Sequence, residues 1–180
     1  KKYKLYLDKI NNAIKTNLYE GIISKNYAPE NDEDIKAGER VFYTPENAKI
    51  IDTIRKEIDT IPIHYQKYFM APLLVKASIH TNTGGIFKGF YKCSKTGIGK
   101  YGGNGENALS RIKKEIKLEP PIFSNYECKI NIYQKDANEL VKELNNLDIV
   151  YIDPPYNQHP YGSNYFMLNT IAENSICSSI

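Results

Sequence analysis

The chain has 180 residues and a formal net charge of only +3, so its length suits one domain, or one core with a peripheral lobe. No run approaches the about 18 consecutive apolar residues of a membrane helix, and residues 1–15 mix charged and apolar side chains unlike a signal peptide, which predicts a soluble, cytoplasmic protein. Neither a disulfide framework nor a structural metal is expected, because the cysteines and histidines lack ligand spacing: Cys93, Cys128, Cys177, His64, His80 and His159.

The first half of the chain reads as helical. Apolar residues recur at helical spacing in residues 3–14, whereas residues 20–42 are polar and irregular and predict an exposed loop. Thr44 and Pro45 provide a capping residue and a first-turn proline, so a helix is expected from there to about Asp59. A further, largely buried helix is predicted over residues 63–78.

Glycine-rich turns interrupt the next part of the chain. Residues 81–85 form a turn cluster, and the apolar residues that follow predict a short strand over residues 86–91. Residues 97–105 read as a flexible, glycine-rich basic loop, and a helix is expected over residues 107–116.

The pattern changes near residue 125. Residues 127–134 predict a strand, residues 136–144 a short helix and residues 148–152 a second strand. A strand, helix and strand joined by a short crossover are typical of a parallel α/β sheet. We therefore divide the chain into a helical region, residues 1–125, and part of an α/β domain, residues 126–180.

Positive charge is concentrated in one stretch. Acidic residues predominate between Glu20 and Glu39, whereas basic residues predominate between Lys88 and Lys117, where Phe90 and Tyr91 lie among them. A basic segment with interspersed aromatic residues suits a polyanion such as DNA. An ordinary solvated helix face and loop remains the alternative.

The second predicted strand ends on an unusual sequence, Asp153-Pro154-Pro155-Tyr156. Proline lacks the amide hydrogen of a ladder bond, so the two prolines end the strand. The flanking residues suit a planar amine, because Asp153 can accept a hydrogen bond from an exocyclic amino group and Tyr156 offers a ring for stacking. Base stacking on an aromatic side chain contributes about 1–3 kcal/mol.

This motif resembles the catalytic motif of adenine-N6 DNA methyltransferases of the bacterial, Dam-related restriction-modification type. Related enzymes that methylate cytosine or glutamine amines carry Ser or Asn at its first position. The flanking segments extend the resemblance over residues 1 to about 173: ERVFYTPENAKIIDTIR, TNTGGIFKGFYK, QKDANEL and YNQHPYGSNYFMLNTIA. The resemblance implies a partial Rossmann-like sheet of the S-adenosylmethionine (SAM)-dependent methyltransferase fold, with a mainly helical target-recognition lobe.

The resemblance also implies roles for the motif residues. Asp153 and the Pro154 carbonyl would hold the adenine amino group toward the methyl donor, with Pro155 keeping the turn rigid. Tyr156 would stack on the adenine after it is flipped out of double-stranded DNA.

Cofactor and DNA contacts follow from the same resemblance. Asp136 and Asp153 are expected to contact SAM, although Asp136 also suits a helix cap. The residues expected to contact DNA lie between the two motifs and in the loop after the catalytic motif: Lys88, Tyr91, Lys92, Lys100, Asn157, Tyr161 and Asn164. For residues 158–164, an ordinary polar turn is an equal alternative.

The glycine-rich Phe-x-Gly-x-Gly turn that binds SAM in this family is not found, and residues 173–180 depart from the family pattern. The sequence therefore looks truncated at both ends. We expect the isolated chain to have little or no activity, and a complementary chain with the missing cofactor segment is a candidate partner. A non-catalytic DNA-binding module, or one subunit of a split methyltransferase, is the alternative function.

Overall fold

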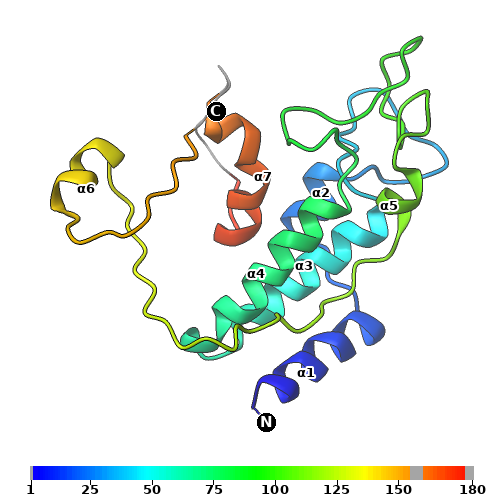
Figure 1. The fold of residues 1–180 in the computed structure, drawn as a ribbon. Coiled ribbons are helices and arrows are strands. Elements are labelled where there is room, and N and C mark those ends of the chain that lie inside the picture. Colours follow the sequence, from blue (N-terminus) through cyan, green and yellow to red (C-terminus); the bar gives the residue numbers. More distant parts are fainter. Residues whose placement is uncertain (1, 155–159, 177–180) are drawn as a thin grey trace. The chain divides into compact units, whose positions relative to one another are not determined.

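A computed structural model describes residues 2–154 and 160–176, and the regular secondary structure within them is helical (Figure 1). The helices are α1 (Lys2–Thr16), α2 (Ile22–Tyr27), α3 (Pro45–Asp59), α4 (Ile63–Ile79), α5 (Leu109–Lys113), α6 (Ala137–Glu143) and α7 (Tyr161–Glu173). The chain forms two compact units. Unit 1 is Lys1–Pro121 with His159–Ile180, and unit 2 is Ile122–Gln158. None of the helices in the described residues is long and apolar enough to cross a membrane.

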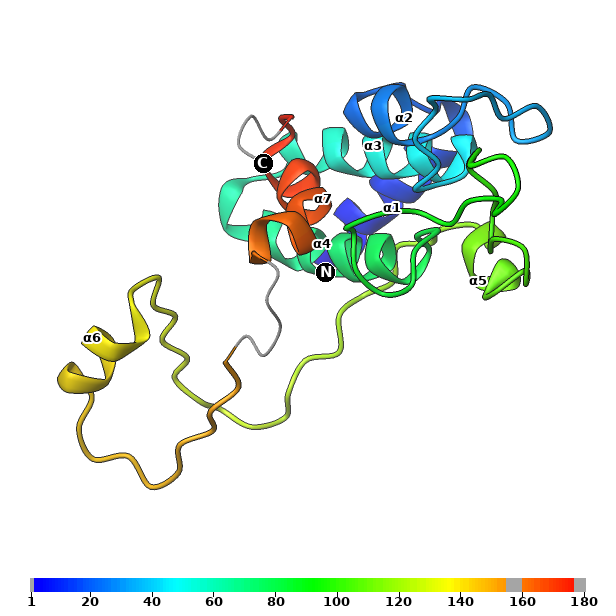
Figure 2. The ribbon, with the colours of Figure 1, turned by 90° about the horizontal axis from the view of Figure 1, so that it is seen from above.

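Helix α3 is the centre of unit 1. The helix starts at Thr44 and Pro45, as predicted from the sequence: Thr44 Oγ1 accepts a hydrogen bond from the Asn47 amide at 3.1 Å, and Pro45 occupies the first turn. Helices α1, α2, α4 and α7 all pack against α3, as Figure 2 shows from above. The helices predicted over residues 3–14, 44–59 and 63–78 are thus confirmed.

The core of unit 1 joins these helices through apolar and aromatic side chains. From α3 it takes a row of buried isoleucines: Ile50, Ile51, Ile54 and Ile58. The rings of Tyr3 on α1 and Phe69 on α4 are stacked with their centroids 4.5 Å apart. Such contacts explain why α4, whose apolar residues surround the whole helix, is stable within unit 1.

A buried carboxylate fastens α2 to α3. Asp52, only 4% exposed, accepts hydrogen bonds at 2.8–2.9 Å from the backbone amides of Gly21, Ile23 and Ser24. The Ser24 hydroxyl donates a further bond to it at 2.7 Å. Asp52 therefore acts as the N-terminal cap of α2 from another helix, since the amides of a first turn have no partner within their own helix.

Helix α7 is held in unit 1 at its C-terminal end. Arg55 of α3 donates hydrogen bonds to the carbonyls of Ile171 at 2.9 Å and Ala172 at 3.1 Å. A cation at this end of a helix satisfies carbonyls that have no helical partner and is favoured by the helix dipole. As a result, α7 packs with the helices that precede residue 125 in the sequence.

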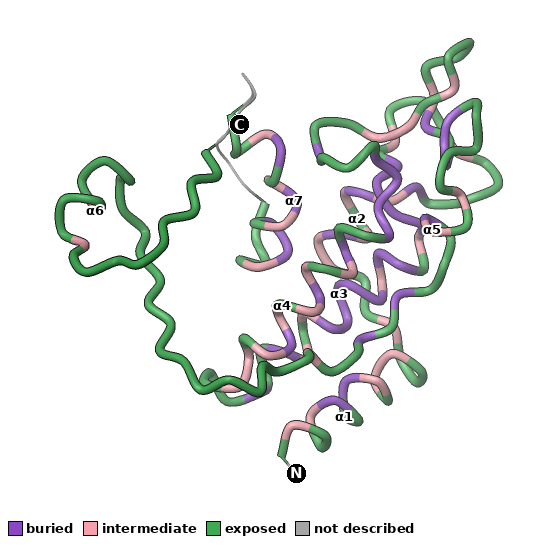
Figure 3. The backbone as a smooth tube through the Cα atoms, viewed as in Figure 1, coloured by how far each residue is buried: buried purple, intermediate pink, exposed green. Residues whose placement is uncertain are grey.

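The prediction of a partial Rossmann-like sheet is wrong. In the part of the chain that the structure describes there is no β-strand, and residues 127–134 and 148–152 have no regular secondary structure and are exposed. Ile132, Ile149 and Tyr151 are 86–90% exposed, and Figure 3 shows unit 2 as almost entirely exposed. An apolar, strand-like sequence becomes a strand only when a neighbour supplies ladder hydrogen bonds and side-chain contacts, and residues 122–154 of unit 2 supply no such neighbour.

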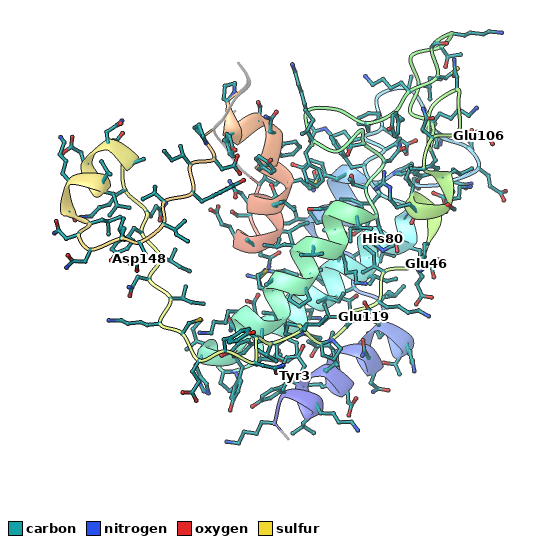
Figure 4. The ribbon with its side chains drawn as sticks, in the orientation of Figure 1. Tyr3, Glu46, His80, Glu106, Glu119 and Asp148 are labelled. Atoms are coloured by element: carbon teal, nitrogen blue, oxygen red, sulfur yellow. The ribbon has the colours of Figure 1, made fainter. Side chains whose placement is uncertain are left out.

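One titratable side chain is buried where α4 ends. His80 is 6% exposed, and its Nδ1 lies 2.8 Å from the Arg111 carbonyl oxygen (Figure 4). Burial lowers the pKa of His80 below its ordinary value of 6.5, and the positive charges of Lys76, Lys114 and Arg111 lower it further, whereas the hydrogen bond to the carbonyl opposes this change. The folded protein therefore favours a neutral imidazole that donates through Nδ1.

We expect the free energy of unfolding to fall on acidification because of His80. Its pKa is lower in the folded than in the unfolded state, so the unfolded state binds the proton more readily. The stabilisation is complete above pH 6.5 and is lost as the pH falls below that value. Urea unfolding at several pH values should show this loss in the natural protein, and a smaller loss in His80→Asn. Equal pH dependence in both proteins would contradict the prediction.

Candidate functional site

The strand predicted over residues 86–91 is wrong, because these residues form a bend, a turn and irregular structure, and a hairpin-shaped loop begins where they end. The Lys100 amide donates to the Tyr91 carbonyl at 3.0 Å, and the Cys93 amide donates to the Ile98 carbonyl at 2.8 Å. Lys92 and Gly99 form an isolated antiparallel bridge between these two hydrogen bonds. We call residues 91–100 the basic hairpin, because Lys92, Lys95 and Lys100 are exposed on it and it contains no acidic residue.

The structure brings together four of the residues expected to contact DNA. Lys92 and Lys100 are exposed, and Tyr91 is half-buried, all on the basic hairpin. Lys88 is exposed just before it, and Lys92 Nζ lies 5.1 Å from the centroid of the Phe90 ring. Clustered lysines beside aromatic rings form a surface that suits the phosphates and bases of a nucleic acid.

Helix α7 contributes two more of the predicted residues. Tyr161 is 52% exposed, and its ring centroid lies 5.1 Å from that of Tyr165. Asn164 is 2% exposed, and its carbonyl accepts a hydrogen bond from the Phe87 amide at 3.0 Å. Asn164 therefore connects α7 to the loop that leads into the basic hairpin, while its own side chain is buried.

The two carboxylates predicted to contact the cofactor, Asp136 and Asp153, lie in unit 2. Asp153 and Pro154 are exposed after the segment of residues 148–152, whereas Pro155, Tyr156 and Asn157 lie outside the described residues. Asp136 is exposed at the start of α6, where its Oδ1 accepts hydrogen bonds from the amides of Asn138 at 2.8 Å and Glu139 at 3.3 Å. The helix-capping role of Asp136 is thus seen directly.

Groups of acidic, cysteine and histidine side chains that could hold a metal are absent from residues 2–154 and 160–176. Asp136 and Asp153 are carboxylates, which accept hydrogen bonds from amines and hydroxyls and stabilise positive charge.

A comparison with known proteins identifies the family. The profile of the family described as "D12 class N6 adenine-specific DNA methyltransferase" matches residues 2–176. The chain belongs to this family. Membership in the methyltransferase family confirms the resemblance that the Asp153–Tyr156 motif indicates. The matched range includes the basic hairpin, Asp136 and the whole motif.

Several curated proteins are similar to this member of the methyltransferase family. "Type II methyltransferase M.NlaIII" from Neisseria lactamica is 35% identical over 159 residues, which are 85% of this chain and 42% of that protein. "Type II methyltransferase M.CviAII" from Paramecium bursaria Chlorella virus 1 is 28% identical over 178 residues, 92% of this chain and 47% of that protein. "Type II methyltransferase M.FokI" from Planomicrobium okeanokoites is 31% identical over 161 residues, 86% of this chain and 22% of that protein.

The chain thus spans less than half the length of these relatives. No solved structure shows a significant match to it.

Proposed function

We propose that this chain carries the amine-binding and DNA-contacting parts of a restriction-modification methyltransferase that transfers a methyl group from SAM to the N6 amino group of adenine in double-stranded DNA. The observation that supports this most directly is the family match over residues 2–176, which includes the complete Asp153-Pro154-Pro155-Tyr156 motif. The similarity to relatives named type II methyltransferases points in the same direction.

The motif would act by orientation. The Asp153 carboxylate and the Pro154 carbonyl accept hydrogen bonds from the adenine amino group, which aims the nitrogen lone pair at the methyl donor. Tyr156 stacks on the flipped base, because a paired adenine cannot bring its amino group to the donor. As the nitrogen becomes cationic, the negative charge of Asp153 stabilises it, and a fixed geometry contributes a large share of the acceleration.

SAM fits the carboxylates that unit 2 presents. When bound, it supplies an electrophilic methyl group on a positively charged sulfur, and it also carries ribose hydroxyls and amino groups that donate hydrogen bonds. Asp136 uses Oδ1 to cap α6, so Oδ2 can accept a hydrogen bond from such a donor. Asp153 is exposed and would supply negative charge near the transferred methyl group. We therefore propose that both carboxylates contact the cofactor.

The basic hairpin would hold the DNA backbone. Lys92 and Lys100 are exposed on it, and with Lys88 they suit phosphate contacts that fix position more than sequence. We also propose Tyr91, Tyr161 and Asn157 as DNA-contacting residues. Asn164 would support this surface from α7, because its side chain is buried.

The proposal is tested by following tritiated methyl groups from SAM into double-stranded DNA, with the chain in excess over DNA and long incubations so that slow transfer is detected. The product is then identified as N6-methyladenine by mass spectrometry of the digested DNA. Transfer above the background of an Asp153→Ala protein supports the proposal. DNA binding without any such transfer would instead favour a DNA-binding module or one subunit of a split enzyme.

The basic hairpin gives a separate prediction. Replacing Lys92 and Lys100 together by Gln should weaken binding to double-stranded DNA, and should reduce the magnitude of the slope of log K against log salt by about 1 for each phosphate that a lysine no longer neutralises. Fluorescence anisotropy with labelled DNA at several salt concentrations measures both quantities.

A charge-matched control uses helix α1, which lies at the end of unit 1 remote from the basic hairpin (Figure 1). Lys4 and Lys15 are exposed there, and replacing both by Gln changes the net charge equally. This control should leave the salt slope near that of the natural protein. Equal effects of the two double substitutions would show that only total charge matters, and that the hairpin is not the contact surface.

A further inference from the structure

Asn82 is a buried side chain with an unusually complete set of hydrogen bonds. It is 0% exposed. Its Nδ2 donates to the Val41 carbonyl at 2.8 Å and to the Lys100 carbonyl at 3.4 Å, and its Oδ1 accepts from the Gly102 amide at 2.9 Å. Both side-chain donors and the side-chain acceptor are therefore used.

The backbone of Asn82 continues this pattern. Its amide donates to the Phe42 carbonyl at 2.7 Å, and its carbonyl accepts from the Tyr91 amide at 3.0 Å. Tyr91 and Lys100 are the first and last residues of the basic hairpin, and they are bonded to each other. Asn82 thus binds both ends of the hairpin and joins them to the segment of residues 41–42 beside the core.

A close approach at Gly99 strengthens this connection. A Cβ atom on Gly99 would lie 2.3 Å from Val41 Cγ2 and 3.2 Å from the Phe90 ring, so only glycine allows the returning arm of the hairpin to lie this near to Val41. The base of the hairpin is therefore fixed by packing and by the Asn82 amide. Residues 94–97, by contrast, are exposed.

The position of the lysines follows from this arrangement. Lys92 and Lys100 lie on the two arms of the hairpin: Lys92 follows Tyr91, which Asn82 binds, and the carbonyl of Lys100 itself accepts a hydrogen bond from Asn82. Without the amide, the Gly102 N–H and the Val41 carbonyl would lose their partner, and unsatisfied buried groups are costly enough to favour a shifted or loosened hairpin. Phosphate contacts require cations at defined places along the backbone of DNA.

We propose that Asn82 is a positioning residue for DNA binding, acting through the basic hairpin by holding Lys92 and Lys100 where they contact phosphates. The inference rests on the proposed DNA contact of these lysines. Asn82 itself touches no DNA, because it is fully buried.

A double-mutant cycle tests the coupling. Binding to labelled random-sequence double-stranded DNA is measured for the natural chain, Asn82→Ala, the Lys92→Gln/Lys100→Gln pair and the combination. We expect substitution of the lysine pair to weaken binding about tenfold in the natural chain and less than about threefold in the Asn82→Ala chain. In the Asn82→Ala chain the lysines no longer lie where they contact phosphates, so removing their charge costs little binding free energy. The salt slope of Asn82→Ala should fall toward that of the lysine variant, although its net charge is unchanged.

Asn47 provides a matched control. It is 1% exposed, its Nδ2 donates to the Ile112 and Lys114 carbonyls, and its Oδ1 accepts from the Ile116 amide, so it is a buried amide that tethers a different segment. In Asn47→Ala the full effect of the lysine pair should persist. Circular dichroism and thermal unfolding establish that each variant is folded at the assay temperature. Asn82→Ser, which places one hydroxyl where the amide was, replaces Asn82→Ala if the latter does not fold.

The outcomes distinguish the positioning role of Asn82 from the DNA contact of Lys92 and Lys100. An undiminished effect of the lysine pair in the Asn82 variant overturns the positioning role and leaves the proposed DNA contact intact. A lysine pair without effect in the natural chain overturns the DNA contact of the hairpin, and the positioning role with it. A reduced effect in Asn82→Ala together with a full effect in Asn47→Ala supports the proposal.

Discussion

Replacing Asp153 by Ala, in a complex with a chain that supplies the missing cofactor segment, is expected to reduce methyl transfer to DNA by about 100- to 1000-fold, the usual effect of removing one group that stabilises developing charge at a reacting centre. The carboxylate is exposed in unit 2, so its loss leaves no buried partner without a hydrogen bond. The substitution should therefore leave folding and DNA binding close to those of the natural chain. Tritium transfer, anisotropy with labelled DNA and thermal unfolding measure the three properties.

Two further variants sharpen this experiment. Asp153→Asn keeps the size and one acceptor oxygen but removes the negative charge, so it should retain more transfer than Asp153→Ala and less than the natural chain. Asp148→Ala removes an exposed carboxylate from the same segment and should have little effect (Figure 4). Equal losses in Asp148→Ala and Asp153→Ala would mean that negative charge in this segment, and not the motif, is what transfer requires.

The second large effect is expected at Asp52, where replacement by Ala should lower the free energy of unfolding by about 3–5 kcal/mol. The substitution leaves the amides of Gly21, Ile23 and Ser24 without their shared acceptor. Each buried N–H without a partner costs about 1–3 kcal/mol, although water that enters at the half-buried end of α2 limits the sum.

Urea unfolding followed by circular dichroism measures this change. Asp8→Ala, which removes an exposed carboxylate from α1, is the matched control and should change stability by less than about 0.5 kcal/mol. Gly21→Ala should also destabilise the protein, because the added Cβ would lie 2.8 Å from Asp52 Cγ and displace the carboxylate. A stable Asp52→Ala protein would show that α2 is held by its apolar contacts alone.

The helices could be predicted from the sequence because their signals are local. Thr44, Pro45 and the isoleucines of α3 lie within one stretch of chain, and together they define where the helix starts and which face is buried. The same holds for the motif at Asp153, whose residue types are adjacent and whose family is confirmed.

The strand predictions were wrong because a strand forms only beside a neighbouring strand, which local sequence does not reveal. Residues 127–134 and 148–152 have the composition of strands, but composition does not supply the neighbouring ladder. The roles of Asp52 and Asn82 were missed for a related reason. Asp52 lies within a predicted helix and Asn82 within the predicted turn cluster of residues 81–85, whereas the partners of both side chains lie elsewhere in the chain.

The chain leaves unit 1 after Pro121 and returns to it with α7, so unit 2 is an insertion whose two ends are anchored in the same body. The hydrogen bonds from Arg55 to the end of α7 therefore close a long loop of the chain without a covalent bond. The entropy cost of closing such a loop grows only logarithmically with its length. Insertions or deletions within residues 122–154 should consequently leave the docking of α7 nearly unchanged, which gives this part of the chain freedom to vary in length while the helices of unit 1 keep their arrangement.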